Sequence, residues 1–381
     1  MPRTNFSPLI HGFKFANTFT NTLANIPGFG KVETYGRCGG MAYTALDYYF
    51  GGLAVPLAGD LPADGVPLAD YIFERQVLSF TSPSAINFIT WSLYADEPSW
   101  FFKGLSLATR QDEFPRLKSQ LDLGHPQVLG LISARDIGHI GDNHQVVACG
   151  YEIEDASGKI SVFIYDVNTP DTETVLTLIP GGIGVQASNR ADPWRGFFVH
   201  GYGPMWPYYL LDGALVKENS QPQVYVITRG GKLPIPDDHE FAAMGYSQAR
   251  IQDVPDGALT FVSDAPGDGT VLQERGHSDF YVVYGGAKFH IADETIFNSL
   301  GLLEGNVKRV PAGSLAGVPD LPREGSLLRE MDDGPVFVMR GGMRRQIPNV
   351  QDLSKLGFLW NNIRVVPDGG LTSIPDGGLL S

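Results

Sequence analysis

Cysteine is nearly absent from this sequence, with only Cys38 and Cys149 among 381 residues. Two cysteines do not make a disulfide framework, so the composition favours a reducing compartment. No apolar run reaches the length of a membrane-spanning helix, and residues 1–19 lack the compact apolar segment of a Sec signal peptide. We therefore expect no membrane span, and a location in the cytoplasm or one reached by export without a Sec signal.

Positive charge is also scarce. Lysine and arginine total 28 against 42 acidic residues, and the net charge is −14. No long basic run occurs, which argues against a nucleic-acid partner. Hydrophobic residues make up 43% and charged residues 18%, a composition able to bury a core. The 46 glycines and 27 prolines indicate many turns and short strands.

The second half of the sequence contains an internal repeat with a period of 56 residues. Six columns keep this register: Gly213, Gly269 and Gly325; Tyr225, Tyr281 and Phe337; Ile235, Ile291 and Ile347; Gly245, Gly301 and Gly357; Pro255, Pro311 and Pro367; Gly257, Gly313 and Gly369. Such self-similarity predicts three copies of one supersecondary unit. We therefore divide the chain into a first domain, 1–212, and a three-repeat domain, 213–381, with repeats 213–268, 269–324 and 325–381.

Each repeat is predicted to be rich in β-structure and to contain one short helix. Glycine pairs at 230–231, 285–286 and 341–342 indicate hairpin turns. Asp237, Asp293 and Asn349 stand where a helix N-cap is needed, and the glycine column at 245, 301 and 357 fits the helix end. One repeat is too small to bury its own apolar face, so the copies must pack together, either as a closed threefold body or as a stack.

The first 212 residues show a different pattern, in which helices are followed by strands. Helical spacing of apolar residues predicts helices over 40–50, 68–78, 84–94 and 112–121. Strands are predicted over 128–132, 145–153, 160–165, 172–179 and 196–200, with a hairpin turn at 155–158. Helices that lead into an antiparallel sheet indicate an α+β fold.

Three residues of the first domain have the chemistry of a thiol-dependent active site. Cys38 precedes the first predicted helix, where free N–H groups and the helix dipole stabilise a thiolate and an oxyanion. His144 opens one strand of the predicted hairpin, and Asp166 follows the other. Antiparallel pairing brings these two together, so a carboxylate can orient the imidazole that serves as base.

The order Cys, His, Asp resembles that of papain-like cysteine peptidases, in particular the C39-like group. Cys38-Gly39 at a helix start, His144 in a strand that runs into Gly150-Tyr151, and Asp166 after the next strand match that group over about residues 20–210. The resemblance implies a papain-like fold, cleavage of an amide or peptide bond through an acyl-enzyme, and no cofactor. It also implies a glutamine shortly before the nucleophile, but residues 30–37 contain neither glutamine nor asparagine. Gly39 and Tyr35 are therefore candidates for binding the substrate or the oxyanion, and Asn168 is a second candidate for orienting the histidine.

Plainer interpretations of the same residues stay open. Cys38 could pack at a helix start, His144 could be a core histidine, and Asp166 could cap a turn. Cys149 is expected to be an inert buried thiol. No Cys/His spacing indicates a zinc site, and Asp166, Asn168 and Asp171 lack the glycine and distal glutamate of a calcium loop.

Three functions follow from these observations. The first is an amide or peptide hydrolase, and the second is an acyltransferase that uses the same thiol with an amine as acceptor. The third is a binding or adhesion protein whose first domain has lost activity. The repeats are candidates for targeting, including contact with a surface or a carbohydrate, or for stability alone.

Overall fold

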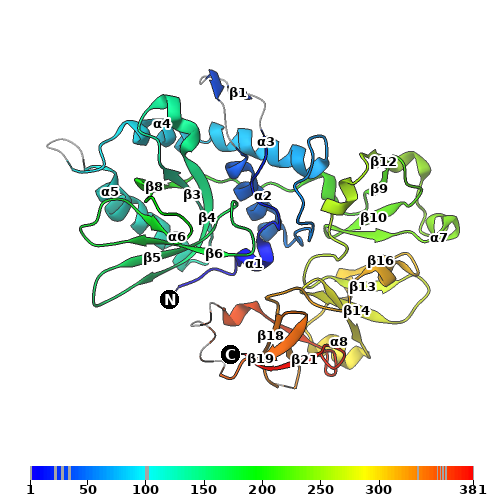
Figure 1. Cartoon of the computed structure of the whole chain (residues 1–381). Helices are drawn as coiled ribbons and strands as arrows, with labels where there is room; N and C mark the ends of the chain where they lie inside the picture. The colour runs from blue at the N-terminus through cyan, green and yellow to red at the C-terminus, as the bar shows by residue number, and fades with distance from the viewer. Residues whose placement is uncertain are drawn as a thin grey trace. The chain divides into compact units, whose positions relative to one another are not determined.

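The computed structural model describes residues 2–20, 24–26, 30–32, 36–98, 103–332, 334–349, 351, 353, 356 and 358–380 (Figure 1). The chain divides into two compact units. The first comprises residues 1–47, 58–63 and 69–205, and the second comprises residues 48–57, 64–68 and 206–381. Both helices and antiparallel sheets are present, which confirms the α+β class.

The four predicted helices of the first half are present, each within a few residues of its predicted limits. They are α2 (Cys38–Gly51), α3 (Pro67–Thr81), α4 (Ile86–Leu93) and α6 (Phe114–Asp122). The sequence did not indicate the short helix α1 (Pro8–His11), nor α5 (Leu105–Ala108) with the π-helical turn Thr109–Glu113 that joins it to α6. A small hairpin of β1 (Ala24–Ile26) and β2 (Gly30–Val32) precedes α2.

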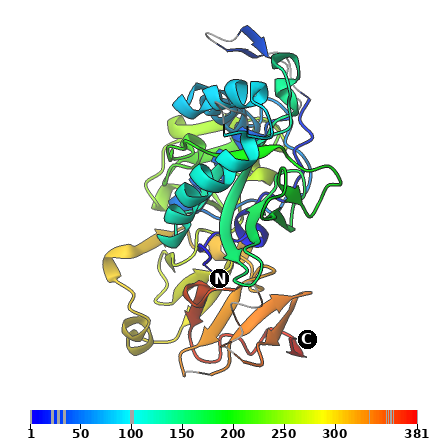
Figure 2. The ribbon, with the colours of Figure 1, turned by 90° about the vertical axis from the view of Figure 1, so that its left-hand side faces the viewer.

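The five predicted strands belong to one six-stranded antiparallel sheet, ordered β7-β6-β5-β4-β3-β8. Its strands are β3 (Gln127–Ile132), β4 (His144–Ile153), β5 (Ile160–Tyr165), β6 (Glu173–Leu178), β7 (Gln186–Ala187) and β8 (Gly196–His200). Helix α6 lies along this sheet (Figures 1 and 2), and its Phe114, Leu117 and Leu121 pack on strand residues such as Val146 and Ala148. Successive side chains of a strand point to opposite faces, so Gln145 and Val147 face away from α6.

The three repeats form three sheets with the same strand order. The first is β11-β10-β9-β12, the second is β15-β14-β13-β16, and the third is β19-β18-β17-β20 with β21 added at the edge. In each, two antiparallel pairs are completed by a parallel pair, β9 with β12, β13 with β16 and β17 with β20. The strands are β9 (Leu215–Glu218), β10 (Tyr225–Thr228), β11 (Gly231–Pro234), β12 (Ile251–Val254), β13 (Val271–Glu274), β14 (Phe280–Tyr284), β15 (Ala287–Ile291), β16 (Val307–Val310), β17 (Leu327–Glu330), β18 (Phe337–Arg340), β19 (Met343–Gln346), β20 (Ile363–Val366) and β21 (Asp376–Leu379).

The helices of the repeats begin and end as the sequence predicts, where they are described. Asp237 caps α7 (Asp238–Ala243) and Asp293 caps α8 (Glu294–Ser299), each by accepting a backbone hydrogen bond. Gly245 and Gly301 follow with φ of 72° and 69°, the left-handed conformation that favours glycine. Gly357 lies outside the described residues. Ile235, Ile291 and Ile347 are all buried, as expected for a shared core.

One turn prediction is wrong by one residue. Gly285-Gly286 and Gly341-Gly342 form the hairpin turns of the second and third repeats, but in the first repeat Thr228 pairs with Gly231, so the turn is Arg229-Gly230. Arg229 has a φ of 45° and stands where the other two repeats have glycine. The register of the strands, and not the presence of two glycines, determines the turn.

Neighbouring repeats share cores. One cluster joins first-repeat residues such as Leu233 and Phe241 to second-repeat residues such as Leu272. Another joins Phe289 of the second repeat to Leu328 of the third. Equivalent ion pairs recur 56 residues apart, Asp212 with Lys308 at 3.2 Å and Asp268 with Arg364 at 3.3 Å. Each repeat therefore packs on the next, as its small size requires. Among the described residues, no helix combines the length and the apolar character needed to cross a membrane.

Candidate active site

Cys38 is the first residue of α2, where the helix leaves its N–H groups without intrahelical partners. The turn before it is made by Gly36, whose φ is 89°. Buried Met41, Ala45 and Leu46 hold the helix in the core. This arrangement fixes the position of the thiol at a helix N-terminus, which stabilises negative charge.

Gly39 and Gly40 have a packing role. A Cβ on Gly40 would lie 2.0 Å from the carbonyl oxygen of Ile72 in α3, and one on Gly39 would lie 2.4 Å from the Gln145 side chain. The two glycines therefore let α2 approach α3 and β4 closely. The cavity beside Cys38 is lined by Gly36 and not by Gly39.

His144 and Asp166 form a buried pair. Nε2 of His144 and Oδ1 of Asp166 are 2.8 Å apart, and the residues are 6% and 5% exposed. Asp166 also accepts hydrogen bonds from the Asn168 backbone N–H at 3.0 Å and from the Asn189 side chain at 2.8 Å. The β4–β5 pairing places the start of one strand beside the end of the other, as the sequence predicts.

Electrostatics favours an imidazolium at His144. Burial by itself lowers the pKa of His144, but the Asp166 charge and hydrogen bonds with Asp166 and Cys38 outweigh burial and raise that pKa to about 10. Burial raises the pKa of Asp166, but the His144 charge and the hydrogen bonds it accepts outweigh burial and lower it to about 2. The imidazole can thus take and hold a proton from a neighbouring thiol.

A cavity of about 430 Å³ brings the reactive groups together. Its lining includes Cys38, His144 and Asn168. The other lining residues are mostly small or polar: Ala16, Asn17, Thr18, Phe19, Gly36, Gly141, Asp142, Asn143 and Trp194. The Asn168 side-chain nitrogen lies 3.4 Å from Nε2 of His144. Tyr35, the other candidate from the sequence, lies outside the described residues. Cys149 is 1% exposed and donates to the Phe163 carbonyl at 3.3 Å, in accord with an inert thiol.

Asn17 is a cavity residue that the sequence did not indicate. Its Oδ1 accepts a hydrogen bond from the Arg37 backbone N–H at 2.6 Å, one residue before Cys38. Its own backbone N–H donates to the Val167 carbonyl at 3.0 Å, one residue after Asp166. Because Oδ1 accepts this bond, Nδ2 is the donor atom of the Asn17 side chain. Nδ2 lies beside Gly36, and a Cβ placed on Gly36 would be 2.4 Å from it. Asn17 is 21 residues before Cys38, too far for a local motif to reveal.

The wall beside His144 is formed by Trp194. The two rings stack with centroids 5.9 Å apart and an interplanar angle of 14°. The Arg190 guanidinium lies 3.9 Å from the Trp194 ring centroid. A stacked indole limits the rotation of the imidazole and keeps water from it.

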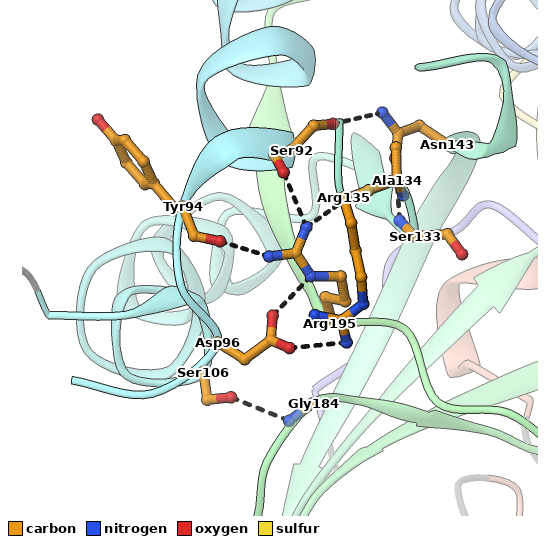
Figure 3. A network of polar contacts seen from close by, with 10 residues as sticks. All are labelled: Ser92, Tyr94, Asp96, Ser106, Ser133, Ala134, Arg135, Asn143, Gly184 and Arg195. Atoms are coloured by element: carbon orange, nitrogen blue, oxygen red, sulfur yellow. Dashed lines mark hydrogen bonds and ion pairs between the residues drawn. The ribbon is translucent and has the colours of Figure 1, made fainter. Parts of the chain in front are cut away.

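A polar network fixes the neighbours of His144 and Trp194 (Figure 3). Asn143 accepts hydrogen bonds from the backbone N–H groups of Ser133 and Ala134, and its side chain donates to Ser92. Arg195 is buried and binds the Asp96 carboxylate and the carbonyls of Ser92, Tyr94 and Ala134. Asn143 precedes His144 in the chain and Arg195 follows Trp194. Both are therefore anchored by hydrogen bonds to residues at the end of α4.

Comparisons with known proteins leave the family open. No protein-family model matches the chain, and no curated protein matches it. A solved structure titled "Structure of the periplasmic assembly from the ESX-5 inner membrane complex" aligns with 46% of this chain at 12% identity, with a TM-score of 0.13. The alignment spans 62% of the length of that chain, and its low TM-score carries no argument about fold or function. The class defined by the fold is α+β.

Proposed function

We propose that the first unit is a papain-like cysteine hydrolase that cleaves an amide or peptide bond. The observation that carries the proposal is the single cavity that contains Cys38 at a helix start and His144 backed by Asp166. This is the geometry of a nucleophile, a base and the group that orients the base.

The residues act in successive steps of the reaction. His144 takes the proton of Cys38, and the resulting thiolate attacks the substrate carbonyl carbon. The negative charge that develops on the carbonyl oxygen is stabilised by the backbone N–H of Cys38, the first residue of α2, and by Nδ2 of Asn17. His144 then gives its proton to the leaving amine. Water, deprotonated by His144, releases the acyl group from Cys38.

Asn17 supplies the side-chain amide that the sequence around Cys38 lacks. It lies between the segment of the nucleophile and the segment of Asp166, bonded to Arg37 and to Val167. The side-chain oxygen and the backbone N–H of Asn17 are both hydrogen-bonded, so its Nδ2 is held in place before charge develops. An oxyanion site requires donors that are fixed in advance in this way.

The test is alkylation by iodoacetamide across pH, followed by mass spectrometry of both cysteine peptides. We expect iodoacetamide to modify Cys38 in the wild type and to do so much more slowly in His144→Gln. Cys149 should stay unmodified in the folded protein because it is buried. Turnover of a fluorogenic peptide library should be lost in Cys38→Ala and kept in Cys149→Ala. Slow alkylation of Cys38, equal in the wild type and His144→Gln, would contradict the proposal.

A further inference from the structure

Among the described residues that line the Cys38 cavity, Asp142 is the one whose charge the proposed mechanism does not use. Apart from Cys38 and His144, the other lining residues are uncharged. The proton that Cys38 and His144 exchange stays inside the cavity, so this exchange does not change the net charge of the cavity. Asp142 therefore determines the sign of the charge that a substrate meets beside the reacting sulfur.

The position of Asp142 is fixed by its neighbours in the chain. Asp142 is the last residue of the 3₁₀-helical turn Ile137–Asp142. The next residue, Asn143, accepts hydrogen bonds from two backbone N–H groups that follow β3 (Figure 3). His144 then opens β4. Because two residues span at most about 7 Å, the Cα atoms of Asp142 and of the proposed base lie no further apart than this.

The charge of Asp142 is not neutralised by the loop that carries it. Asp142 is exposed, and in the part of the chain that the structure describes no hydrogen bond or ion pair engages its carboxylate. The hydrogen bond with Asp136, 2.8 Å long, is the main cause of the raised pKa of His139, and the Asp142 charge adds to it. Two carboxylates thus share one imidazole, and the loop keeps a negative charge even when that imidazole is protonated.

The arginines near the cavity are engaged elsewhere. Arg37 precedes the nucleophile, but its guanidinium donates to the Ala69 carbonyl at 3.1 Å. Arg190 lies over the ring of Trp194, 3.9 Å from the ring centroid. Neither arginine is among the described residues that line the cavity, and no lysine is. A cationic group of a substrate would therefore meet no like charge from the lining.

We propose that Asp142 makes the site select a peptide with a lysine or arginine side chain next to the amide that Cys38 attacks. This inference rests on the proposed hydrolase function and names its substrate class. A carboxylate attracts a cation and repels an anion at the same place, so it discriminates between substrates. The net charge of −14 acts in the same direction, because it steers cationic peptides toward the chain.

The first test measures charge selection at Cys38 without turnover. The full chain is treated with two methanethiosulfonate reagents of similar size, one with a trimethylammonium group and one with a sulfonate group, and mass spectrometry of the Cys38 peptide gives both rates. We expect the ratio of the cationic to the anionic rate to fall about tenfold in Asp142→Asn. A change in the reactivity of the thiol itself affects both rates equally and cancels in the ratio.

The matched control is Asp136→Asn. It removes the same charge from the same loop, six residues earlier and outside the cavity lining. It should change the ratio of the two rates much less than Asp142→Asn does. An equal ratio in the wild type and Asp142→Asn would overturn the inference, whatever the outcome for the hydrolase.

The second test uses a fluorogenic peptide library in which each lysine peptide is paired with its N-acetyl-lysine form, which keeps the shape and removes the charge. The wild type should have a higher kcat/KM for the lysine form, and Asp142→Asn should lose most of this preference. Equal turnover of the two forms by the wild type would overturn the inference. No turnover of any peptide, with a reagent ratio that still depends on Asp142, would count against hydrolysis and leave the charge selection at Cys38 in place.

Discussion

At the scale of the residue, Asn17 is where sequence and structure differ most. The sequence identifies Cys38, His144 and Asp166 because each stands at the end of an element with its own pattern. Asn17 precedes the β1–β2 hairpin and has no such pattern around it. Its place beside Cys38 depends on two hydrogen bonds to residues distant in sequence, Arg37 and Val167, which local patterns do not reveal.

We predict that Asn17→Ala lowers kcat by about 10²- to 10³-fold with little change in KM, because one oxyanion donor is lost. Steady-state kinetics on the best library substrate measures this. The control is the rate of Cys38 alkylation, which involves no oxyanion and should stay within a few-fold of the wild type. An Asn17→Ala enzyme with normal kcat would remove Asn17 from the mechanism.

The His144 pair also predicts how stability depends on pH. The pKa of His144 is raised from 6.5 to about 10 on folding, so its contribution is complete below pH 6.5 and is lost as pH rises toward 10. The pKa of Asp166 is lowered from 3.8 to about 2, so its contribution is complete above pH 3.8 and is lost as pH falls through 2.

Urea unfolding between pH 6.5 and 10 should therefore show a fall in the unfolding free energy of the wild type that is smaller in His144→Gln. His139→Gln is the matched control. The hydrogen bond with Asp136 and the charge of Asp136 raise the pKa of His139, but this imidazole is exposed and solvent weakens the interaction. The same pH dependence of the unfolding free energy in the wild type and His144→Gln would contradict a raised pKa of His144 in the folded protein.

At the scale of the element, the spacing of apolar residues predicts most helices and strands of the first half. The four long helices and the five main strands of the first half were predicted because their apolar residues recur at helical or alternate spacing. The segment from Leu105 to Gln111 was missed because a π-helical turn changes the spacing between α5 and α6. Gly39 shows what spacing does not reveal. The sequence makes it a candidate for binding the substrate or the oxyanion, and in the structure Gly39 and Gly40 let α2 pack closely on β4 and α3.

The repeat helices give a prediction with an internal control. Gly301 has a φ of 69° and Gly305 does not have a positive φ, and a Cβ on either would meet no atom within 4 Å. Gly301→Ala should therefore cost about 1–2 kcal/mol through backbone strain alone. Gly305→Ala should cost much less. Chemical denaturation of both variants measures the difference, and equal costs would mean that α8 can end without a left-handed residue.

At the scale of the whole molecule, residues 48–57 belong to the second unit although they lie far from the repeats in sequence. Leu53 lies against Gly230, and the Gly52 carbonyl lies where a Cβ of Gly267 would be. The sequence predicts that residues 1–212 fold alone, because the repeat register begins at Gly213. It could not predict that a loop after α2 uses the first repeat as its partner.

We expect a chain of residues 1–212 to fold with a lower thermal midpoint than the full chain, because buried Leu53 and Val55 lose their cover. A chain ending at residue 324 should recover the midpoint, since Leu272 and Val283 of the second repeat complete the core of the first. Differential scanning calorimetry of both chains decides this. A 1–212 chain as stable as the full chain would show that the 48–57 segment needs no partner.

The hydrogen bond from the Arg37 backbone N–H to the Asn17 side chain determines where the chain can accept an insertion. It closes the intervening segment at its base, so the ends of that segment are held together however long the path between them is. Doubling a closed loop costs only about 0.6 kcal/mol. A peptide tag or reporter spliced between β1 and β2 should thus leave Cys38 and Asn17 in place, which makes this hairpin a practical insertion point.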